Sequence, residues 1–326
     1  MSGPLLEVKG LRVEFPTRRG TLVAVDGISF SIAPGEVLGV VGESGAGKSL
    51  TGMAVIGLLE PPGRIAAGEI RLEGERIDQL PYEKMRRIRG RRIGAIFQDP
   101  LTSLNPLYTV GTQLIETIQT HLDLAPAEAR ARALALLREV GIPAPESRVD
   151  HYPHQFSGGM RQRVVIALAL CAEPRLVIAD EPTTALDVSI QAQIIQLLKR
   201  LARERGTAVM LITHDMGVIA ETADRVAVMY AGRIAEIGPV REVIHAPRHP
   251  YTVGLMGSIP KVGAGVGKRH ARLVQIEGAM PRLNAIPAGC AFNPRCPKRF
   301  ERCLRERPGP LPAGSNLVAC WLHVHG

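Results

Sequence analysis

The chain has 326 residues, of which 45 % are hydrophobic and 22 % are charged, as in a globular protein large enough for two domains. Its formal net charge of +9 is densest in KMRRIRGRR at 84–92, yet aromatic residues make up only 4 % of the chain and none lies among these arginines. A nucleic-acid site built on stacked bases is therefore disfavoured, and a solvated helix face followed by a loop is the favoured interpretation.

Signals for export or for crossing a membrane are weak. The opening sequence MSGPLLEVKGLRVEF lacks the basic start and apolar stretch of a secretory signal. The longest apolar run, VVIALALCA at 164–172, is about half as long as a membrane span. We expect the chain to stay in the cytoplasm, where a membrane protein is still an available partner.

Hydrophobic patterns along the chain follow the order sheet, helices, sheet. Strand-like segments come first, at 5–15, 23–32 and 36–42. The third is apolar nearly throughout, which is typical of a strand buried on both faces of a sheet. Helical periodicity follows from 102 to 172, and buried strands then return at 175–180, 208–214 and 225–232. This order predicts an α/β core into which a helical subdomain is inserted.

The same patterns divide the chain into two parts. We expect the core to span 1–240, with the inserted helical subdomain at about 99–170. The remainder, 241–326, is richer in Pro and Gly, and 261–269 resembles a linker. A small irregular extension that contains four of the five cysteines ends the chain.

GESGAGKS at 42–49 is the first motif that carries chemistry. It lies between a buried strand and a helical segment and matches G-x-x-x-x-G-K-[ST], the pattern of a phosphate-binding loop. The glycines let successive backbone N–H groups turn toward phosphate oxygens, Lys48 adds positive charge at the β- and γ-phosphates, and Ser49 offers its hydroxyl to Mg²⁺. We expect a nucleoside triphosphate to bind Gly42, Glu43, Ser44, Gly45, Ala46, Gly47, Lys48 and Ser49.

RLVIADEP at 175–182 supplies the acidic groups that hydrolysis needs. Asp180 ends a buried strand at the sheet edge where the phosphate loop lies, and is expected to be a second Mg²⁺ ligand. Glu181 follows it and is expected to polarise the attacking water. His214, after another apolar strand, is expected to sense the γ-phosphate, although a histidine taken alone is more often a capping or packing residue.

Three more motifs complete an ordered set: FSGGMRQR at 156–163, FQDP around Gln98 and ALD at 185–187. With them, the chain resembles the nucleotide-binding subunit of an ATP-binding-cassette (ABC) transporter over residues 5–239. The resemblance implies a P-loop ABC-type ATPase core that binds ATP and Mg²⁺. It also implies that Gln98 ligates Mg²⁺ or the attacking water and marks the hinge to the helical subdomain.

The resemblance further implies that two cassettes close head to tail around two nucleotides. Residues Ser157, Gly158, Gly159 and Met160 would then complete the ATP site of the partner cassette, because a helix start in this position forms an anion-binding nest. Met160 stands where the family most often has Gln, so backbone and Ser157 contacts would carry γ-phosphate recognition. Two further residues are assigned to nucleotide binding, Asp187 of ALD and Phe15. Phe15 would stack on adenine, and a simple core position fits it nearly as well.

Two longer stretches narrow the resemblance. FQDPLTSLNP at 97–106 and HPYTVGLMGSIP at 249–260, followed by the cysteines, are similar to the ATPase subunits of dipeptide and oligopeptide importers, with nickel importers as close relatives. This implies a peripheral ATPase on the cytoplasmic face of the cytoplasmic membrane. Its implied partners are two transmembrane permease subunits, a second and related ATPase, and, indirectly, an extracytoplasmic peptide-binding protein.

A nickel or other metal importer stays open as an alternative, and so does a soluble ABC protein of translation or DNA repair. The soluble translation factors usually carry two cassettes in one chain, and this chain has one. The repair proteins interrupt the cassette with a long coiled coil, and no heptad stretch lies between Gln98 and Ser157.

Cys290, Cys296, Cys303 and Cys320 have the spacing C-x5-C-x6-C-x16-C, whereas Cys171 lies apart in an apolar helical segment. A cytoplasmic location disfavours disulfides, and four thiolates suit either Zn²⁺ or a [4Fe–4S] cluster. The gaps are longer than the C-x₂₋₄-C pairs of structural zinc sites. The resemblance to peptide-importer ATPases points to the [4Fe–4S] cluster, whose negative charge would be offset by Arg295, Lys298 and Arg302.

Overall fold

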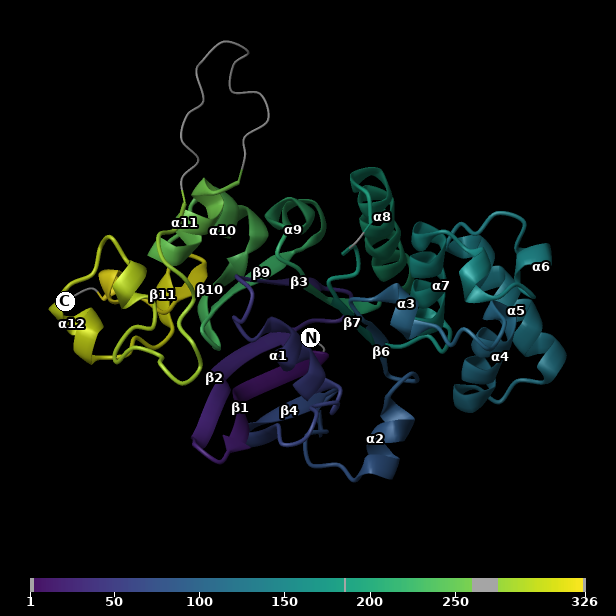
Figure 1. The fold of residues 1–326 in the computed structure, drawn as a ribbon, viewed down its shortest axis with the longest axis horizontal. Helices are drawn as coiled ribbons and strands as arrows, with labels where there is room; N and C mark the ends of the chain where they lie inside the picture. The colour runs from purple at the N-terminus through teal and green to yellow at the C-terminus, as the bar shows by residue number, and fades with distance from the viewer. Residues whose placement is uncertain (1–2, 185, 260–274, 325–326) are drawn as a thin grey trace, which may run out of the picture.

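The computed structural model describes residues 3–184, 186–259 and 275–324. The linker expected at 261–269 lies outside these residues, as does the alanine of the ALD motif. Figure 1 shows an elongated molecule, with a helical lobe at one end of its longest axis and the cysteine-rich extension at the other. Among the described residues, no helix combines the length and the apolar composition that a membrane crossing requires.

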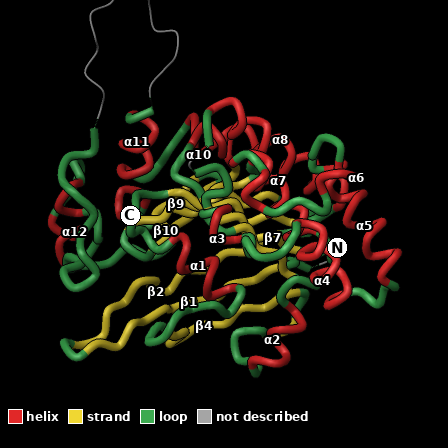
Figure 2. The backbone as a smooth tube through the Cα atoms, turned by 45° about the vertical axis from the view of Figure 1, so that its right-hand side comes forward, coloured by secondary structure: helices red, strands yellow, loops and turns green. Residues whose placement is uncertain are grey.

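Two sheets form the framework, and Figure 2 shows them as two stacked layers of strands. The smaller sheet is antiparallel and has the order β2-β1-β4-β5, with bounds Gly20–Ile32, Leu6–Thr17, Arg64–Leu72 and Glu75–Arg76. The larger sheet has the order β11-β12-β10-β9-β3-β8-β7-β6. Its strands β9, β3, β8, β7 and β6 are all parallel, as the continuous apolar runs predict. The bounds in the larger sheet are Leu311–Ala313 for β11, Asn316–Val318 for β12, Arg233–Pro239 for β10, Arg225–Tyr230 for β9, Val37–Val41 for β3, Ala208–Ile212 for β8, Leu176–Asp180 for β7 and Ile93–Ile96 for β6.

Helices fill the connections between these strands. Between β6 and β7 the chain forms the helical lobe, which consists of α3 (Pro100–Ser103), α4 (Val110–His121), α5 (Pro126–Glu139), α6 (Pro145–Arg148) and α7 (Gly158–Leu170). The others are α1 (Lys48–Val55), α2 (Tyr82–Ile88), α8 (Val188–Arg205), α9 (Met216–Thr222), α10 (Val240–His245), α11 (Pro250–Gly257) and α12 (Glu301–Arg305). The predicted α/β fold with a helical insertion is confirmed.

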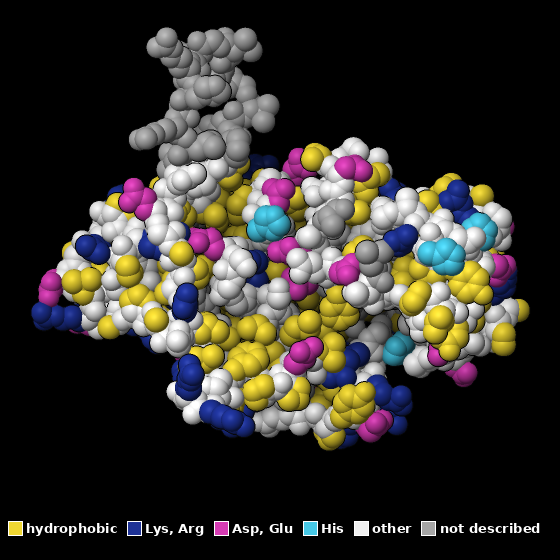
Figure 3. Space-filling model, in the orientation of Figure 1, with side chains coloured by type: hydrophobic (Ala, Val, Ile, Leu, Met, Phe, Trp, Pro, Cys, Tyr) yellow, Lys and Arg dark blue, Asp and Glu magenta, His cyan; other side chains and the backbone are white. Residues whose placement is uncertain are grey.

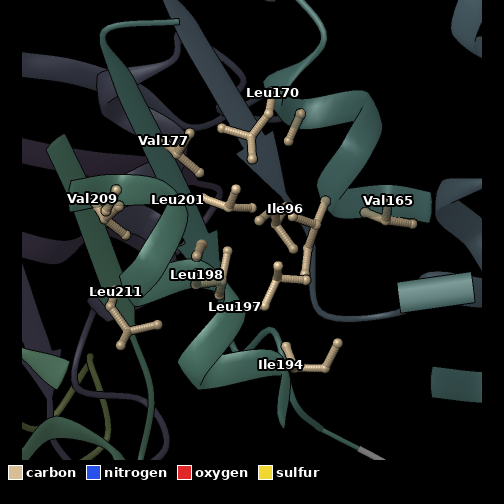
Figure 4. Close-up of a cluster of buried hydrophobic side chains, with 14 of the residues drawn as sticks. Ile96, Val165, Leu170, Val177, Ile194, Leu197, Leu198, Leu201, Val209 and Leu211 are labelled. Atoms are coloured by element: carbon tan, nitrogen blue, oxygen red, sulfur yellow. The ribbon is translucent and has the colours of Figure 1, made fainter. Parts of the chain in front are cut away.

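Helix α8 shows how the sequence builds the core that supports the sheet. Its apolar residues Ile194, Leu197, Leu198 and Leu201 recur at helical spacing and are all buried. Figure 4 shows them beside side chains of β7, β8 and α7. The Asp187 side chain caps the helix by accepting from the backbone of Ile190, and Gly206 ends it in a left-handed conformation. Each buried leucine contributes about 1.5–3 kcal/mol, so packing outweighs propensity in holding α8.

The basic cluster at 84–92 is used mainly within the molecule. Arg89 donates to the carbonyl oxygens of Ile56 and Gly57, and Arg91 donates to that of Ala172. Arg92 pairs with Glu73, in the turn between β4 and β5, and with Glu75 on β5. On the face shown in Figure 3, Lys and Arg side chains are dispersed among acidic and apolar ones. A solvated helix face was predicted here, but several of these arginines also connect segments of the core.

The C-terminal extension is attached to the core through a buried carboxylate on β10. Glu236 is fully buried and accepts hydrogen bonds from the backbone N–H groups of Arg248 and His249 and from the side-chain amide of Asn316. Since Asn316 begins β12, which pairs with β10, the extension continues the core's own sheet. The division of the chain at residue 240 therefore stays a prediction.

His249 is the N-cap of α11 and is 3 % exposed. Its Nδ1 accepts from the backbone N–H of Tyr251 at 3.0 Å, which requires the unprotonated nitrogen. Burial lowers the pKa of His249 to about 4, and a hydrogen bond with the Ala319 backbone opposes that shift. The unfolded chain takes up this proton near pH 6.5, whereas the folded chain does so only near pH 4.

We therefore expect acid to destabilise the fold through His249. Its contribution is fully present above about pH 6.5 and is lost as the pH falls toward 4, by about 3 kcal/mol in total. Thermal unfolding of the full chain between pH 7.5 and 4.5 measures this loss. His249→Gln should unfold at lower temperature at pH 7.5 but show a weaker pH dependence over that range. Equal pH dependence of the two proteins would contradict the assignment.

Candidate active site

The phosphate-loop motif lies between β3 and α1, at the carboxyl end of the strand. Gly42 and Gly47 both have positive φ angles, 152° and 98°. A Cβ atom on Gly42 would lie 2.3 Å from the carbonyl oxygen of Met229, and one on Gly47 would lie 2.9 Å from that of Ala24. A side chain at either position is therefore excluded, because the loop passes so close to β9 and β2.

Lys48 is the first residue of α1 and is 6 % exposed. Its ammonium donates to the carbonyl oxygens of Gly42 at 2.9 Å and Glu43 at 3.1 Å. Burial lowers the pKa of Lys48, and the charges of Glu181, Asp180 and Glu43 oppose that shift. The cation is thus held inside the loop with negative charge close by.

Strand pairing brings two acidic residues to this loop. β7 and β8 are parallel, with Asp180 opposite Ile212, so both strands end at the same edge of the sheet. The Asp180 carboxylate accepts from the Ser49 hydroxyl at 3.0 Å. Two oxygen ligands of the kind that Mg²⁺ prefers therefore lie side by side, at the start of α1.

Glu181 follows β7 and adopts a left-handed backbone conformation with φ of 45°, which is uncommon for a residue with a side chain. Its carboxylate accepts from Gln98 Nε2 at 3.0 Å and from the Thr184 hydroxyl at 2.8 Å. The His214 Nδ1 lies 3.3 Å from its other oxygen. The sequence did not predict a role for Thr184. The available signal was a hydroxyl three residues after Glu181, in EPTT.

The two neighbouring carboxylates have opposite pKa shifts. Burial and the charge of Glu181 raise the pKa of Asp180, against the Ser49 hydrogen bond and the charge of Lys48. Burial also acts to raise the pKa of Glu181, but hydrogen bonds from Thr184 and His214 outweigh it, so that this pKa lies below its usual value. Glu181 is accordingly ionised at neutral pH.

A cavity of about 730 Å³ brings the candidate residues together. Its lining includes Gln98, Glu181, His214 and loop residues 44–49. The segment 280–283 of the extension, Met280 to Leu283, forms a further part of its wall. No motif in the sequence indicated that segment, because it joins the site through a tertiary contact alone.

Several predicted residues lie outside this cavity. Phe15 is half-buried, and its ring packs closely on Gly63. The signature residues begin α7, where the Ser157 hydroxyl accepts from the Met160 backbone, and Ser157 and Gly158 are exposed. The roles given to Phe15, Ser157, Gly158, Gly159, Met160 and Asp187 stay predictions.

The four clustered cysteines line one small cavity in the extension. All four are free thiols: Cys290, Cys296, Cys303 and Cys320. Burial raises the pKa of the first two and raises that of Cys320 to about 11, so a metal would have to displace protons from these thiols. Within the described ranges, no three His, Cys, Asp or Glu side chains are arranged to hold a metal ion.

Only one of the cations expected to compensate a cluster lies at this cavity. Lys298 lines it. Arg295 instead pairs with Glu43, and Arg302 pairs with Glu306. The expectation that these cations offset the charge of a cluster stays a prediction, and the two arginines already pair with other carboxylates.

Comparisons with known proteins agree with this geometry. Residues 25–184 match the family model of the ABC transporter, and residues 235–303 match that of the oligopeptide/dipeptide transporter, C-terminal region. The dipeptide transport ATP-binding protein DppD of Bacillus subtilis is 49 % identical over 98 % of this chain and 94 % of its own. The protein of the same name from Escherichia coli is 47 % identical over 93 % of this chain and 92 % of its own.

Solved structures are similar over the core. A dimeric ATP-binding cassette in a post-hydrolysis state with ADP and Pi has a TM-score of 0.65 and 29 % identity, and covers 72 % of this chain and 99 % of its own. A cassette from an ABC transporter complex of Clostridium perfringens has a TM-score of 0.64 and 31 % identity, over 74 % and 91 %. The chain therefore belongs to the ATP-binding proteins of ABC transporters, in the group that carries the oligopeptide/dipeptide C-terminal region.

Proposed function

We propose that this chain hydrolyses ATP to drive the import of dipeptides or oligopeptides across the cytoplasmic membrane. The observation that carries the proposal is the 49 % identity to a dipeptide transport protein over 98 % of the chain. The match of residues 235–303 to the oligopeptide/dipeptide C-terminal region supports the peptide substrate over nickel. The convergence of the phosphate loop, Gln98, Glu181 and His214 on one cavity supports the reaction.

In the proposed nucleotide site, loop residues 42–49 hold the phosphates through backbone N–H groups and Lys48. Ser49, Asp180 and Gln98 would hold Mg²⁺, whose charge would stabilise the leaving and transferred phosphates. The hydroxyl and carboxylate of the first two already share a hydrogen bond of 3.0 Å, which fits a hard cation with oxygen ligands.

Glu181 is the proposed base that polarises the attacking water. Its ionised state is supported by the lowered pKa and by hydrogen bonds from Thr184 and Gln98. His214 lies beside the same carboxylate and lines the cavity, which suits a sensor of the γ-phosphate. An oriented carboxylate of this kind contributes about 10²–10⁴-fold to a proton transfer.

A second ATPase is the proposed partner at the signature surface. Ser157 and Gly158 are exposed and lie outside the chain's own nucleotide cavity, as expected for residues that complete a partner's site. Val188, next to Asp187, is 81 % exposed. A solvent-exposed apolar residue beside this motif fits a surface that a second cassette covers. The resemblance to peptide importers favours a related but different second ATPase.

The helical lobe is the proposed docking site for a cytoplasmic helix of one of the two transmembrane permease subunits. Leu107 is 78 % exposed and Tyr108 is 51 % exposed, both shortly after Gln98. The adjacent face of α4 is hollowed along Thr112, Ile115 and Gln119, which suits a short helix from a membrane protein. The chain would then lie peripherally on the cytoplasmic face, with an extracytoplasmic peptide-binding protein as an indirect partner.

We also propose that the four clustered cysteines hold a [4Fe–4S] cluster. Four free thiols line one cavity with Lys298 beside them, and thiolates are the usual ligands of iron–sulfur clusters. As they lie in this structure the described side chains are not arranged to hold a metal ion, so the thiols would have to draw together around the cluster. Its role would be structural or regulatory, because phosphoryl transfer needs no electron.

Affinity purification of the tagged chain from membranes of its own cells tests the proposed function. Two permease subunits and a second ATPase should co-purify, and dipeptides with their binding protein should stimulate ATP hydrolysis in the reconstituted complex. Recovery of a homodimer would contradict the proposed pairing. Stimulation by Ni²⁺ with no response to peptides would contradict the proposed substrate.

Glu181→Gln should preserve ATP binding but lower turnover by about 10²–10⁴-fold, because the neutral amide cannot take a proton from water. Lys48→Ala should instead weaken ATP binding, since it removes the cation that faces the phosphates. Binding and steady-state hydrolysis in the assembled transporter separate the two effects. Near-normal turnover of Glu181→Gln would overturn its assignment.

Leu107→Ser should weaken association with the permease subunits about tenfold or more, because it removes an apolar side chain from the docking surface. The melting temperature should stay unchanged, since the residue is exposed. Leu304→Ser is the matched control, because Leu304 is also exposed but lies on α12 at the opposite end of the molecule. Equal recovery of permease subunits with both variants would argue against this surface.

Anaerobically purified protein should be brown, absorb near ~400 nm and contain about four irons per chain. Cys303→Ser should lose the colour and most of the iron. Cys171→Ala should keep both, because Cys171 lies in the core and away from the cavity. Colourless protein that holds one zinc per chain would contradict the iron–sulfur proposal.

A further inference from the structure

Glu43, the second residue of the phosphate loop, is held by two residues from the C-terminal part of the chain. Its backbone N–H donates to the Tyr251 hydroxyl at 3.0 Å. Its carboxylate accepts from Arg295 Nη1 at 3.0 and 3.1 Å. These partners lie 208 and 252 residues away in the sequence, on α11 and in the cysteine-rich extension.

Both partners are themselves fixed. The Tyr251 side chain is fully buried, and its ring lies 4.7 Å from that of Tyr230 and 5.5 Å from that of Phe292. The Arg295 side chain is 7 % exposed. Its guanidinium also donates to the carbonyl oxygens of residues 276–278, so it is oriented independently of Glu43.

Glu43 thereby connects these partners to the phosphate-binding lysine. Its carbonyl oxygen accepts from Lys48 at 3.1 Å, while its N–H and carboxylate contact the C-terminal residues. A glycine-rich loop has many accessible backbone conformations, and a ligand that must order it loses affinity. A loop fixed at Glu43 before binding avoids much of that loss.

We propose that Tyr251 and Arg295 are positioning residues of the nucleotide site, which hold the phosphate loop in its binding conformation through Glu43. The C-terminal extension is then a working part of the ATPase. The inference rests on the proposed function, in that the loop must bind a nucleotide. Neither residue lines the nucleotide cavity, so both act through Glu43 and not by direct contact.

The test measures the affinity of the full-length chain for a fluorescent ADP analogue with Mg²⁺, together with the melting temperature without nucleotide. Arg295→Met removes the donors that hold Glu43, and Glu43→Gln leaves only a neutral acceptor, so each should weaken affinity about tenfold. Tyr251→Phe keeps the packed ring and should weaken affinity about fivefold. In the assembled transporter, the KM for ATP should rise while kcat at saturation changes little.

Arg307→Met is the matched control. Arg307 also joins the extension to the core, by a 3.0 Å contact with Asp26 that does not involve the phosphate loop. Asp26 stays paired with Arg12 and Arg233 in this variant. Nucleotide affinity should therefore remain at the wild-type value.

A double variant separates positioning from general stability. Glu43→Gln combined with Arg295→Met should bind no more weakly than either single variant, because both break the same contact. If the variants lower the melting temperature but leave affinity unchanged, or if Arg307→Met weakens affinity equally, the inference is wrong. If Arg295→Met does not fold, Tyr251→Phe and Glu43→Gln decide the outcome. Failure of the wild-type chain to bind nucleotide would instead count against the proposed function.

Discussion

The parallel pairing of β3, β8 and β7 is the constraint on which the site depends. Val40 and Asp180 both lie opposite Ile212, so the three strands end almost level. The chain that leaves them places Gly42, Glu181 and the histidine after β8 along one edge of the sheet, although they are distant in sequence. Parallel strands buried on both faces cannot slip in register without moving apolar side chains, which is why this edge is well defined.

Sequence and structure agree best where the physics is local. The glycine spacing of the phosphate loop reflects backbone conformations that only glycine reaches without a clash. Such a pattern can therefore be recognised from the sequence alone. The continuous apolar runs predicted the central strands, because a strand buried on both faces of a sheet is apolar along its whole length. The partners of Glu181 were only partly predictable, because Thr184 hydrogen-bonds to it through a turn that no strong motif marks.

The C-terminal part was the least predictable, because its contacts are long-range. Its composition suggested an irregular extension joined by a linker, whereas β12 pairs with β10 and a buried Glu236 joins the two. Nothing in the pattern around Arg295 indicated an ion pair with Glu43. The four clustered cysteines line one cavity, but the sixteen residues between Cys303 and Cys320 are too many for their spacing alone to require this.

The electrostatics of the site explain why two adjacent carboxylates would have different tasks. Asp180 is half-buried beside Glu181, and its pKa is raised by burial and by the charge of Glu181. A divalent cation at Ser49 and Asp180 would compensate the negative charge of Asp180. It would also offset the charge of a triphosphate, which the single buried Lys48 cannot balance. Glu181 is already compensated by its hydrogen bonds and by Lys48, so it stays ionised without the metal. The carboxylate with the raised pKa is thus suited to the cation, and the better hydrogen-bonded one to the water.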